Sequence, residues 1–217
     1  MKWVIKVGGS LFPEYAIKLC KNLVGKDVII ICGGGMFANL LRDYDANIGF
    51  SNTVTHRGAI LCMDILGMLI ADKVDDAEVV YSFNLAQKVL SEGRLPILMP
   101  SKFMEHQNSL EHSWSVTSDS ISLYIAHQLK AKLLIATDVD GIYTRQPSQD
   151  GAELIKYIDA KKLLDFGETS VDEVLGELLI RYKLNCYVIN GKHPERVISI
   201  IDANNVDKTK YTLIGGT

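Results

Sequence analysis

The sequence predicts an α/β fold: a three-layer α/β/α sandwich with a mainly parallel central sheet. Apolar runs of strand length recur along the chain, and stretches with helical periodicity lie between them. The runs are apolar along their whole length, which is typical of parallel strands covered by helices on both faces. The expected strands are residues 3–7, 28–32, 78–81, 95–99, 133–136, 186–189 and 211–214.

Two amphipathic helices are expected directly after the first and second strands. Apolar residues recur at positions i, i+1, i+4, i+5 and i+8 from Tyr15 to Leu23, and the same spacing returns from Met36 to Tyr44. The alternation of strand and helix therefore begins near the N-terminus and continues along the chain.

Composition limits the class of protein. The chain has 217 residues, of which 47% are hydrophobic, and it contains no internal repeat or long polar linker, so we expect one domain over residues 1–217. A net charge of -3 argues against binding to nucleic acid or an anionic membrane surface. No apolar run approaches the ~20 residues that span a bilayer, and no secretory signal is visible, so a cytoplasmic protein is expected.

Several site classes are disfavoured by spacing. The four cysteines, at positions 20, 32, 62 and 186, lie singly in apolar stretches and are expected to be reduced core residues. The histidines do not show a zinc-binding spacing, so no protein-bound metal site is expected, and no G-x-S-x-G elbow suggests a hydrolase.

Glycines follow the first two predicted strands. Gly8 and Gly9 end the first strand, and "GGG" at residues 33–35 ends the second. In parallel sheets ligands bind at these carboxyl ends, where glycine lets the backbone approach a phosphate. Neither turn has the spacing of a P-loop or a dinucleotide fingerprint, so simple tight turns remain an alternative. Lys6, inside the first apolar run, predicts a nearby anion unless that strand is an edge strand facing water.

Two further motifs follow the same logic. "TDVDGIY" at residues 137–143 ends another buried strand, and "TSDS" at residues 117–120 precedes a helical stretch. Alone, the first is consistent with a simple D-G turn, and Asp119 in the second is consistent with a helix cap.

Taken in order, "KVGGSL" (6–11), "GGG", "TSDS" and "TDVDGIY" resemble the amino acid kinase family, whose members transfer the γ-phosphoryl group of ATP to a carboxylate, carbamate or phosphate. The resemblance implies an enzyme that uses ATP and Mg²⁺. It also implies that Lys6 neutralises the transferring phosphoryl group and that Asp119 orients Lys6.

The resemblance assigns the remaining site residues to two sides. The N-terminal part would bind the acceptor, and roughly residues 130–217 would bind the nucleotide. On the nucleotide side, the implied contacts are Gly8, Gly9, Ser10, Thr137, Asp138, Asp140, Gly141 and Tyr143. On the acceptor side they are Gly34, Gly35 and Ser118.

The acceptor is expected to be a small phosphate monoester, which the enzyme would convert to a diphosphate. A second lysine found in several branches of the family is missing from "TSVDEVLGELL" (169–179), whereas Val171-Asp172 and "CMDILGMLIA" (62–71) resemble the uridylate kinase branch. The uracil-binding segment of that branch is absent, and so is the early histidine of the isopentenyl phosphate branch. Those two acceptors stay as alternatives.

The chain looks most like the branch of the family that acts on an aminomethyl-substituted furan phosphate in methanofuran biosynthesis. For such an acceptor, Arg57 could meet the phosphate and Asp64 the aminomethyl cation, although both are also ordinary residues for a helix. A rival from another class is a non-catalytic nucleotide-binding storage or sensor module. A homo-oligomer is also expected, with the apolar helix over residues 59–69 as a dimer face.

Overall fold

The computed structural model describes residues 2–107, 109–166 and 169–216. Its centre is an eight-stranded sheet of order β3-β4-β2-β1-β5-β7-β8-β6, in which the β7–β8 pair is antiparallel and the other pairs are parallel. The expected three-layer fold with a mainly parallel sheet is confirmed. The strands are β1 (Trp3–Val7), β2 (Val28–Cys32), β3 (Ala77–Val80), β4 (Leu95–Leu98), β5 (Lys132–Thr137), β6 (Tyr157–Asp159), β7 (Cys186–Asn190) and β8 (Thr212–Gly215).

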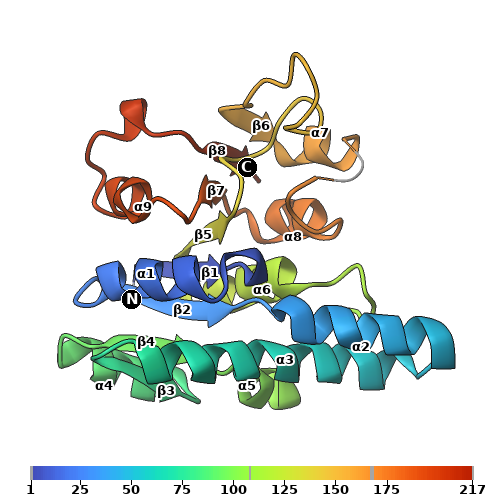
Figure 1. The fold of residues 1–217 in the computed structure, drawn as a ribbon, viewed down its shortest axis with the longest axis vertical. Helices are drawn as coiled ribbons and strands as arrows, with labels where there is room; N and C mark the ends of the chain where they lie inside the picture. The colour runs from blue at the N-terminus through green and yellow to red at the C-terminus, as the bar shows by residue number, and fades with distance from the viewer. Residues whose placement is uncertain (1, 108, 167–168, 217) are drawn as a thin grey trace.

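Helices lie on both faces of the sheet (Figure 1). The α-helices are α1 (Glu14–Leu23), α2 (Gly35–Ile48), α3 (Asn52–Lys73), α4 (Phe83–Ser91), α5 (Pro100–Gln107), α6 (Ser118–Leu129), α7 (Ala160–Leu164), α8 (Leu175–Tyr182) and α9 (Pro194–Ile201). Short 3-10 turns, η1 (Gly9–Leu11) and η2 (Val206–Lys208), complete the described secondary structure.

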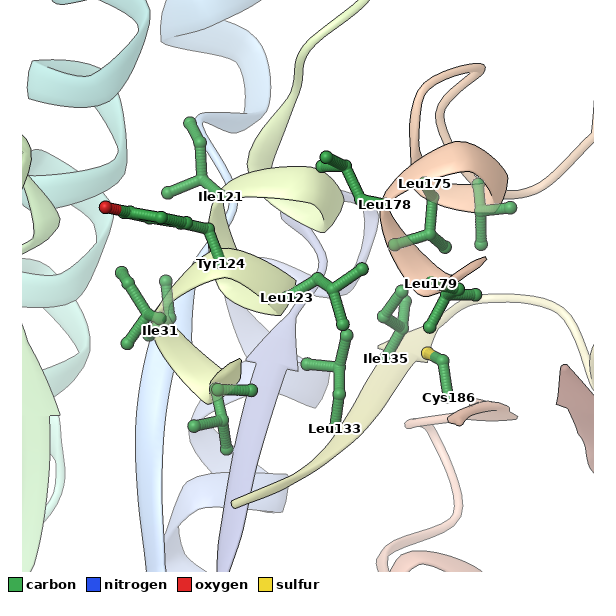
Figure 2. Close-up of a cluster of buried hydrophobic side chains, with 14 of the residues drawn as sticks. Ile31, Ile121, Leu123, Tyr124, Leu133, Ile135, Leu175, Leu178, Leu179 and Cys186 are labelled. Carbon is green, nitrogen blue, oxygen red and sulfur yellow. The ribbon is translucent and has the colours of Figure 1, made fainter. Parts of the chain in front are cut away.

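The core consists of two buried clusters, one on each face of the sheet. Figure 2 shows part of the first, where side chains of α6 and α8 pack on β5 and β7. The second cluster joins α1 and α9 to the opposite face. The four cysteines are free and buried, as expected.

The alternation of side chains along β1 decides where Lys6 points. Val4 belongs to the cluster that contains α6, whereas Ile5 and Val7 belong to the cluster on the other face. Successive strand residues face opposite sides, so Lys6 projects from the same face as Val4. A central strand therefore directs the lysine toward α6.

The strand order of the sheet switches sides at β1: β2, β3 and β4 lie on one side of β1, and β5 and all later strands lie on the other. β1 pairs with β2 on one side and with β5 on the other, all parallel, so three carboxyl ends meet at one edge. Gly8 follows β1, Gly33 follows β2, and Thr137 ends β5. This is the position at which α/β sheets bind ligands.

Two elements differ from expectation. The three-residue edge strand β6 was not predicted, because it is short and its first residue is exposed. The helix over residues 36–44 is confirmed as part of α2, but none of the residues of α2 is buried. α2 packs beside α3, away from the centre of the sheet (Figure 1). Its large apolar side chains form an exposed stripe.

In the part of the chain that the structure describes, α3 is the one helix long and apolar enough to cross a membrane, with a mean hydropathy of 1.5 in its most apolar window. Half of that window is buried inside the protein. Ile60 and Met63 belong to one core cluster, and Leu66 and Ile70 to the other, so α3 is a core helix of this fold.

Candidate functional site

The two glycine turns touch each other beside Lys6. A Cβ placed on Gly9 would lie 2.6 Å from the nitrogen of Gly35, so side chains at this contact would separate the turns. A Cβ on Gly33 would lie 3.0 Å from the nitrogen of Gly9 and 3.6 Å from Cε of Lys6. Gly35 has φ of +53°, a conformation that glycine adopts without strain. Lys6 and the peptide groups of both turns thus line one space.

Asp119 holds the buried ammonium group in place. Nζ of Lys6 lies 2.7 Å from Oδ1 of Asp119, and the two residues are 8% and 4% exposed. Asp119 is in the first turn of α6, where the helix dipole favours a carboxylate, and Thr117 is the N-cap. The predicted pairing of these two side chains is present in the structure.

Asp172 fixes the start of α6 from the other half of the chain. Its carboxylate accepts hydrogen bonds from the backbone N–H and hydroxyl of Thr117, from the same two groups of Ser120, and from the N–H of Leu175, at 2.6–3.0 Å. Its own backbone N–H donates to Oδ2 of Asp119 at 3.2 Å. Burial, and then the charge of Asp119, raise the pKa of Asp172. The segment that lacks the second lysine therefore supports the Lys6–Asp119 pair.

Two cavities adjoin this centre. The first, of about 390 Å³, contains Lys6, both glycine turns and the start of α6 in its wall. The second, of about 520 Å³, is formed by the 137–147 segment and by Phe166, Thr169 and Ser170. Ser10 and Thr137 line both cavities, so they meet at this point. The arrangement provides room for two ligands whose ends meet near Lys6.

Most of the predicted site residues line one of these cavities. The first contains Lys6, Gly8, Gly9, Ser10, Gly34, Gly35, Ser118 and Thr137, and the second contains Ser10, Thr137, Asp138, Gly141 and Tyr143. Four predicted residues do not line either cavity: Asp119, which is the ion-pair partner of Lys6, and Arg57, Asp64 and Asp140.

Arg57 and Asp64 lie on other surfaces of α3. Arg57 lines a separate cavity of about 420 Å³ between α3 and α5. The carboxylate of Asp64 accepts hydrogen bonds from the hydroxyl and the N–H of Ser101 at the start of α5, and burial raises its pKa. Both helix positions were read correctly as helical, but spacing alone did not show which neighbour each side chain faces.

Asp140 has a structural environment instead of a ligand-facing one. Its Oδ1 accepts hydrogen bonds from Asn190 at 3.1 Å and from Arg196 at 2.8 Å, and Lys210 lies 3.6 Å from Oδ2. Partial burial alone would raise its pKa, but the Asn190 hydrogen bond and the Arg196 charge lower it. Asp140 therefore ties the 137–143 loop to β7 and α9.

Several lining residues were missed by the sequence reading. Asn39 and Arg42 line the first cavity from α2, and Trp114 lines it from the segment before α6. Gly35, Asn39 and Arg42 are spaced i, i+4 and i+7, so helical periodicity could have placed them on one face. Trp114 carries no comparable signal. Arg145 and Phe166 similarly line the second cavity.

His56 also lines the first cavity, although no motif in the sequence pointed to it. Its ring stacks on that of His112, with 4.7 Å between the centroids. Burial, followed by the charge of His112, lowers the pKa of His56 to about 4. The imidazole is therefore neutral at pH 7 and does not repel a cationic group of a ligand.

Comparison with known proteins decides the family. The model of the amino acid kinase family matches residues 1–190. The chain belongs to the amino acid kinase family. The family and fold predicted from the sequence are thereby confirmed.

Individual members of the amino acid kinase family are similar over nearly the whole chain. The "[5-(aminomethyl)furan-3-yl]methyl phosphate kinase" of Methanocaldococcus jannaschii is 40% identical over 95% of this chain and 96% of its own length. A "Uridylate kinase" of the same organism is 27% identical over 92% of this chain and 95% of its own length. The crystal structure of uridylate kinase from Archaeoglobus fulgidus has a TM-score of 0.73 at 22% identity, covering 99% of this chain and all of that one.

The contact between the glycine turns yields the first prediction. Gly9→Ala forces the backbone of Gly35 to move, so turnover should fall by about 10²-fold through misplacement of the reacting groups. Steady-state kinetics and thermal melting measure the effect. Gly58→Ala is the matched control, since its new Cβ meets only the end of the Leu41 side chain and the position is helical. Equal turnover by the two variants would contradict this assignment.

The second prediction concerns pH. The unfolded chain binds a proton at His56 near pH 6.5, whereas the folded chain binds it only near pH 4. The folded state therefore loses stability as pH falls between these values, by up to about 3 kcal/mol at ~1.36 kcal/mol per unit. His56→Gln should reduce that loss in urea unfolding experiments between pH 7 and 4. Identical pH profiles for wild type and variant would refute it.

Proposed function

We propose that this protein is an ATP-dependent kinase that converts a phosphate monoester to a diphosphate, with [5-(aminomethyl)furan-3-yl]methyl phosphate as the acceptor in methanofuran biosynthesis. The observation that carries the proposal is the meeting of two cavities at Ser10 and Thr137, beside the Lys6–Asp119 pair. Similarity to the relative of that name, at 40% identity along the chain, supports the choice of acceptor.

ATP would occupy the cavity of about 520 Å³, and the acceptor the cavity of about 390 Å³. This division assigns residues 130–217 to the nucleotide and the N-terminal part to the acceptor. Gly8, Gly9 and Ser10 lie where the phosphates would cross from one cavity to the other. Asp138, Gly141 and Tyr143 line the remainder of the nucleotide side.

The reaction needs charge compensation and alignment more than covalent help from the protein. The acceptor phosphate is ionised at pH 7, so its oxygen can attack the γ-phosphorus without a general base, and ADP leaves. Lys6 and the free N–H groups of the first turn of α2 would neutralise charge on the transferring group. Asp119 and Asp172 would keep Lys6 in place.

Mg²⁺ would reach the site with ATP and compensate the phosphate charges. Among the described residues there is no group of three His, Cys, Asp or Glu side chains that could hold a metal ion. Mg²⁺ commonly binds through substrate phosphates with one or two carboxylates, and Asp138 in the nucleotide cavity fits that limited role.

The acceptor cavity suits a small ring that carries a phosphate, but it lacks the acidic partner that the sequence predicted for an aminomethyl group. Asp64 does not face it, and its described lining residues include no carboxylate. His56 is neutral, and the cavity wall has an apolar surface suited to a ring, formed by Ala59, Met63, Val116 and Ile121.

We also infer a cytoplasmic enzyme without a nucleic-acid or membrane partner.

The third prediction tests the activity. Purified protein with ATP and Mg²⁺ should form ADP and a diphosphate with the furan phosphate, at a kcat/KM well above that for uridylate or isopentenyl phosphate. Coupled ADP release and ³¹P NMR of the products measure this. ATP binding without ADP formation on any acceptor would instead support a storage or sensor module. A higher kcat/KM for uridylate would identify uridylate, and not the furan phosphate, as the acceptor.

Lys6→Ala is the catalytic control for this assay. Loss of its charge should lower kcat by about 10²- to 10³-fold, as removal of one charge-stabilising donor does elsewhere. The unpaired Asp119 would also destabilise the fold, so Lys6→Arg is needed as a folded variant. Lys132→Ala, which removes an exposed lysine stacked on Trp3, should leave turnover unchanged.

We further propose that the protein forms a homodimer through the apolar stripe of α2. Met36, Phe37, Leu40, Tyr44 and Ile48 are 42–83% exposed, and none of the residues of α2 is buried. On α3, where the dimer face was expected over residues 59–69, Leu61, Met68 and Leu69 are also exposed. A second copy that covers this face would remove the apolar surface from water.

The fourth prediction follows. Light scattering after size exclusion should give twice the chain mass of 24.1 kDa, and Leu40→Glu should shift the protein to the single-chain mass. Leu164→Glu, at a leucine of similar exposure on α7, is the control and should stay dimeric. A single-chain mass for the wild type would refute the dimer.

A further inference from the structure

Arg42, Trp114 and Asp45 form a cluster at the α2 side of the acceptor cavity. Arg42 and Trp114 both line that cavity, together with Lys6. The guanidinium carbon of Arg42 lies 4.8 Å from the centroid of the Trp114 ring. Nε1 of Trp114 donates to Oδ2 of Asp45 at 2.7 Å, across 69 positions of the chain. The cluster joins α2 to the segment that leads into α6.

Asp45 fixes the orientation of the indole. Its Oδ1 accepts a hydrogen bond from the backbone N–H of Phe50 at 2.8 Å, so both carboxylate oxygens have donors. The C-terminal end of α2 therefore holds the carboxylate, and the carboxylate holds Trp114. The face of the ring is presented in a fixed position on which the guanidinium lies.

Arg42 is bound differently from the other cation of the cavity. The ammonium of Lys6 is paired with Asp119, whereas among the described residues Arg42 has no carboxylate within ion-pair distance. Stacking on an aromatic ring orients a guanidinium and leaves its N–H donors, which lie in the guanidinium plane, available. Those donors match the oxygens of a phosphate.

The geometry of α2 brings this group toward the reaction centre. Arg42 follows Gly35 by seven residues, which is about 10 Å along a helix at ~1.5 Å per residue. Helical side chains lean toward the N-terminus of their helix, and Arg42 therefore extends back toward the glycine turn. Asn39, one turn closer to Gly35, lines the same cavity.

We propose that Arg42, held on the ring of Trp114, binds the phosphate group of the acceptor, and that Asp45 is a positioning residue acting through Trp114. This rests on the proposed function in one respect, that the acceptor is a phosphate monoester. Arg42 takes the role that the sequence suggested for Arg57, which lines a different cavity.

The charges of the site require a second cation. The acceptor phosphate and the γ-phosphoryl group repel each other as they approach, and Lys6 is already partly neutralised by Asp119. Arg42 is the other arginine or lysine among the described lining residues of the cavity. Its charge also orients the acceptor, because it attracts the phosphate end and repels an aminomethyl cation.

Kinetics with matched arginine variants provide the first test. Arg42→Met should lower kcat/KM for the acceptor by about 100-fold with little change in KM for ATP, as expected for loss of a charge-assisted pair. Arg42→Lys should recover only part of the lost kcat/KM, because an ammonium group does not reproduce the paired N–H donors of a guanidinium. Trp114→Leu should lower kcat/KM for the acceptor by about 10-fold, again without changing KM for ATP. Arg57→Met is the matched control and should resemble wild type.

A binding measurement separates this inference from the identity of the acceptor. Methyl phosphate, titrated calorimetrically in the absence of ATP and followed by tryptophan emission, should bind wild type and Arg57→Met equally. Arg42→Met should bind it at least 10-fold more weakly. That pattern supports Arg42 even if the furan phosphate proves not to be a substrate.

Three results would overturn the inference. Equal affinity of Arg42→Met and wild type for methyl phosphate is one, and loss of acceptor binding in Arg57→Met instead of Arg42→Met is another. The third is an Arg42→Met defect confined to the KM for ATP. Circular dichroism and the melting temperature of each variant identify any that fail to fold, in which case Arg42→Lys alone decides between these outcomes.

Discussion

The buried ion pair of Lys6 and Asp119 is the interaction on which the rest of the site depends. A lysine in the central strand of a covered sheet loses its hydration, and a single carboxylate 2.7 Å away compensates that loss. Asp119 lies in the first turn of α6, so its carboxylate reaches Lys6 only when α6 begins at this position. Asp172 ensures this, since five hydrogen bonds from the start of α6 and of α8 converge on it. A strand, two helices and the glycine turns are thereby held in one arrangement.

The glycine turns follow from the same constraint. The ammonium is useful to a phosphate only if peptide N–H groups reach the same oxygen atoms, and side chains at the ends of β1 and β2 would prevent this. Gly9 and Gly35 have no side chains, so their backbones contact each other directly and leave the peptide N–H groups accessible. The strand order also switches sides at β1, so β5 lies beside β1. The carboxyl end of β5, at Thr137, therefore brings the nucleotide cavity to the same point.

The sequence predicted this centre well and its outer walls poorly, for physical reasons. Lysine is almost never buried without a partner, so Lys6 in an apolar strand beside two glycine turns fits few arrangements other than an anion site. Arg57 and Asp64 lie on a helix whose neighbours could not be known, and one spacing fits several faces. Asp140 was assigned to the nucleotide by resemblance to the family, but Arg196 and Asn190, which are distant in the sequence, donate hydrogen bonds to its carboxylate. The apolar stripe of α2 indicated a helix without indicating what covers it.

The missing second lysine changes the charge balance of the centre and bears on the choice of acceptor. Asp119 pairs with the single ammonium of Lys6, so the inner site has little positive charge to spare. Uridylate brings about two negative charges at pH 7, as other phosphate monoesters do. A furan phosphate with an aminomethyl group brings the same phosphate but offsets one charge itself. Its smaller net charge suits a cavity whose lining cations are Lys6 and Arg42 and whose histidine is neutral.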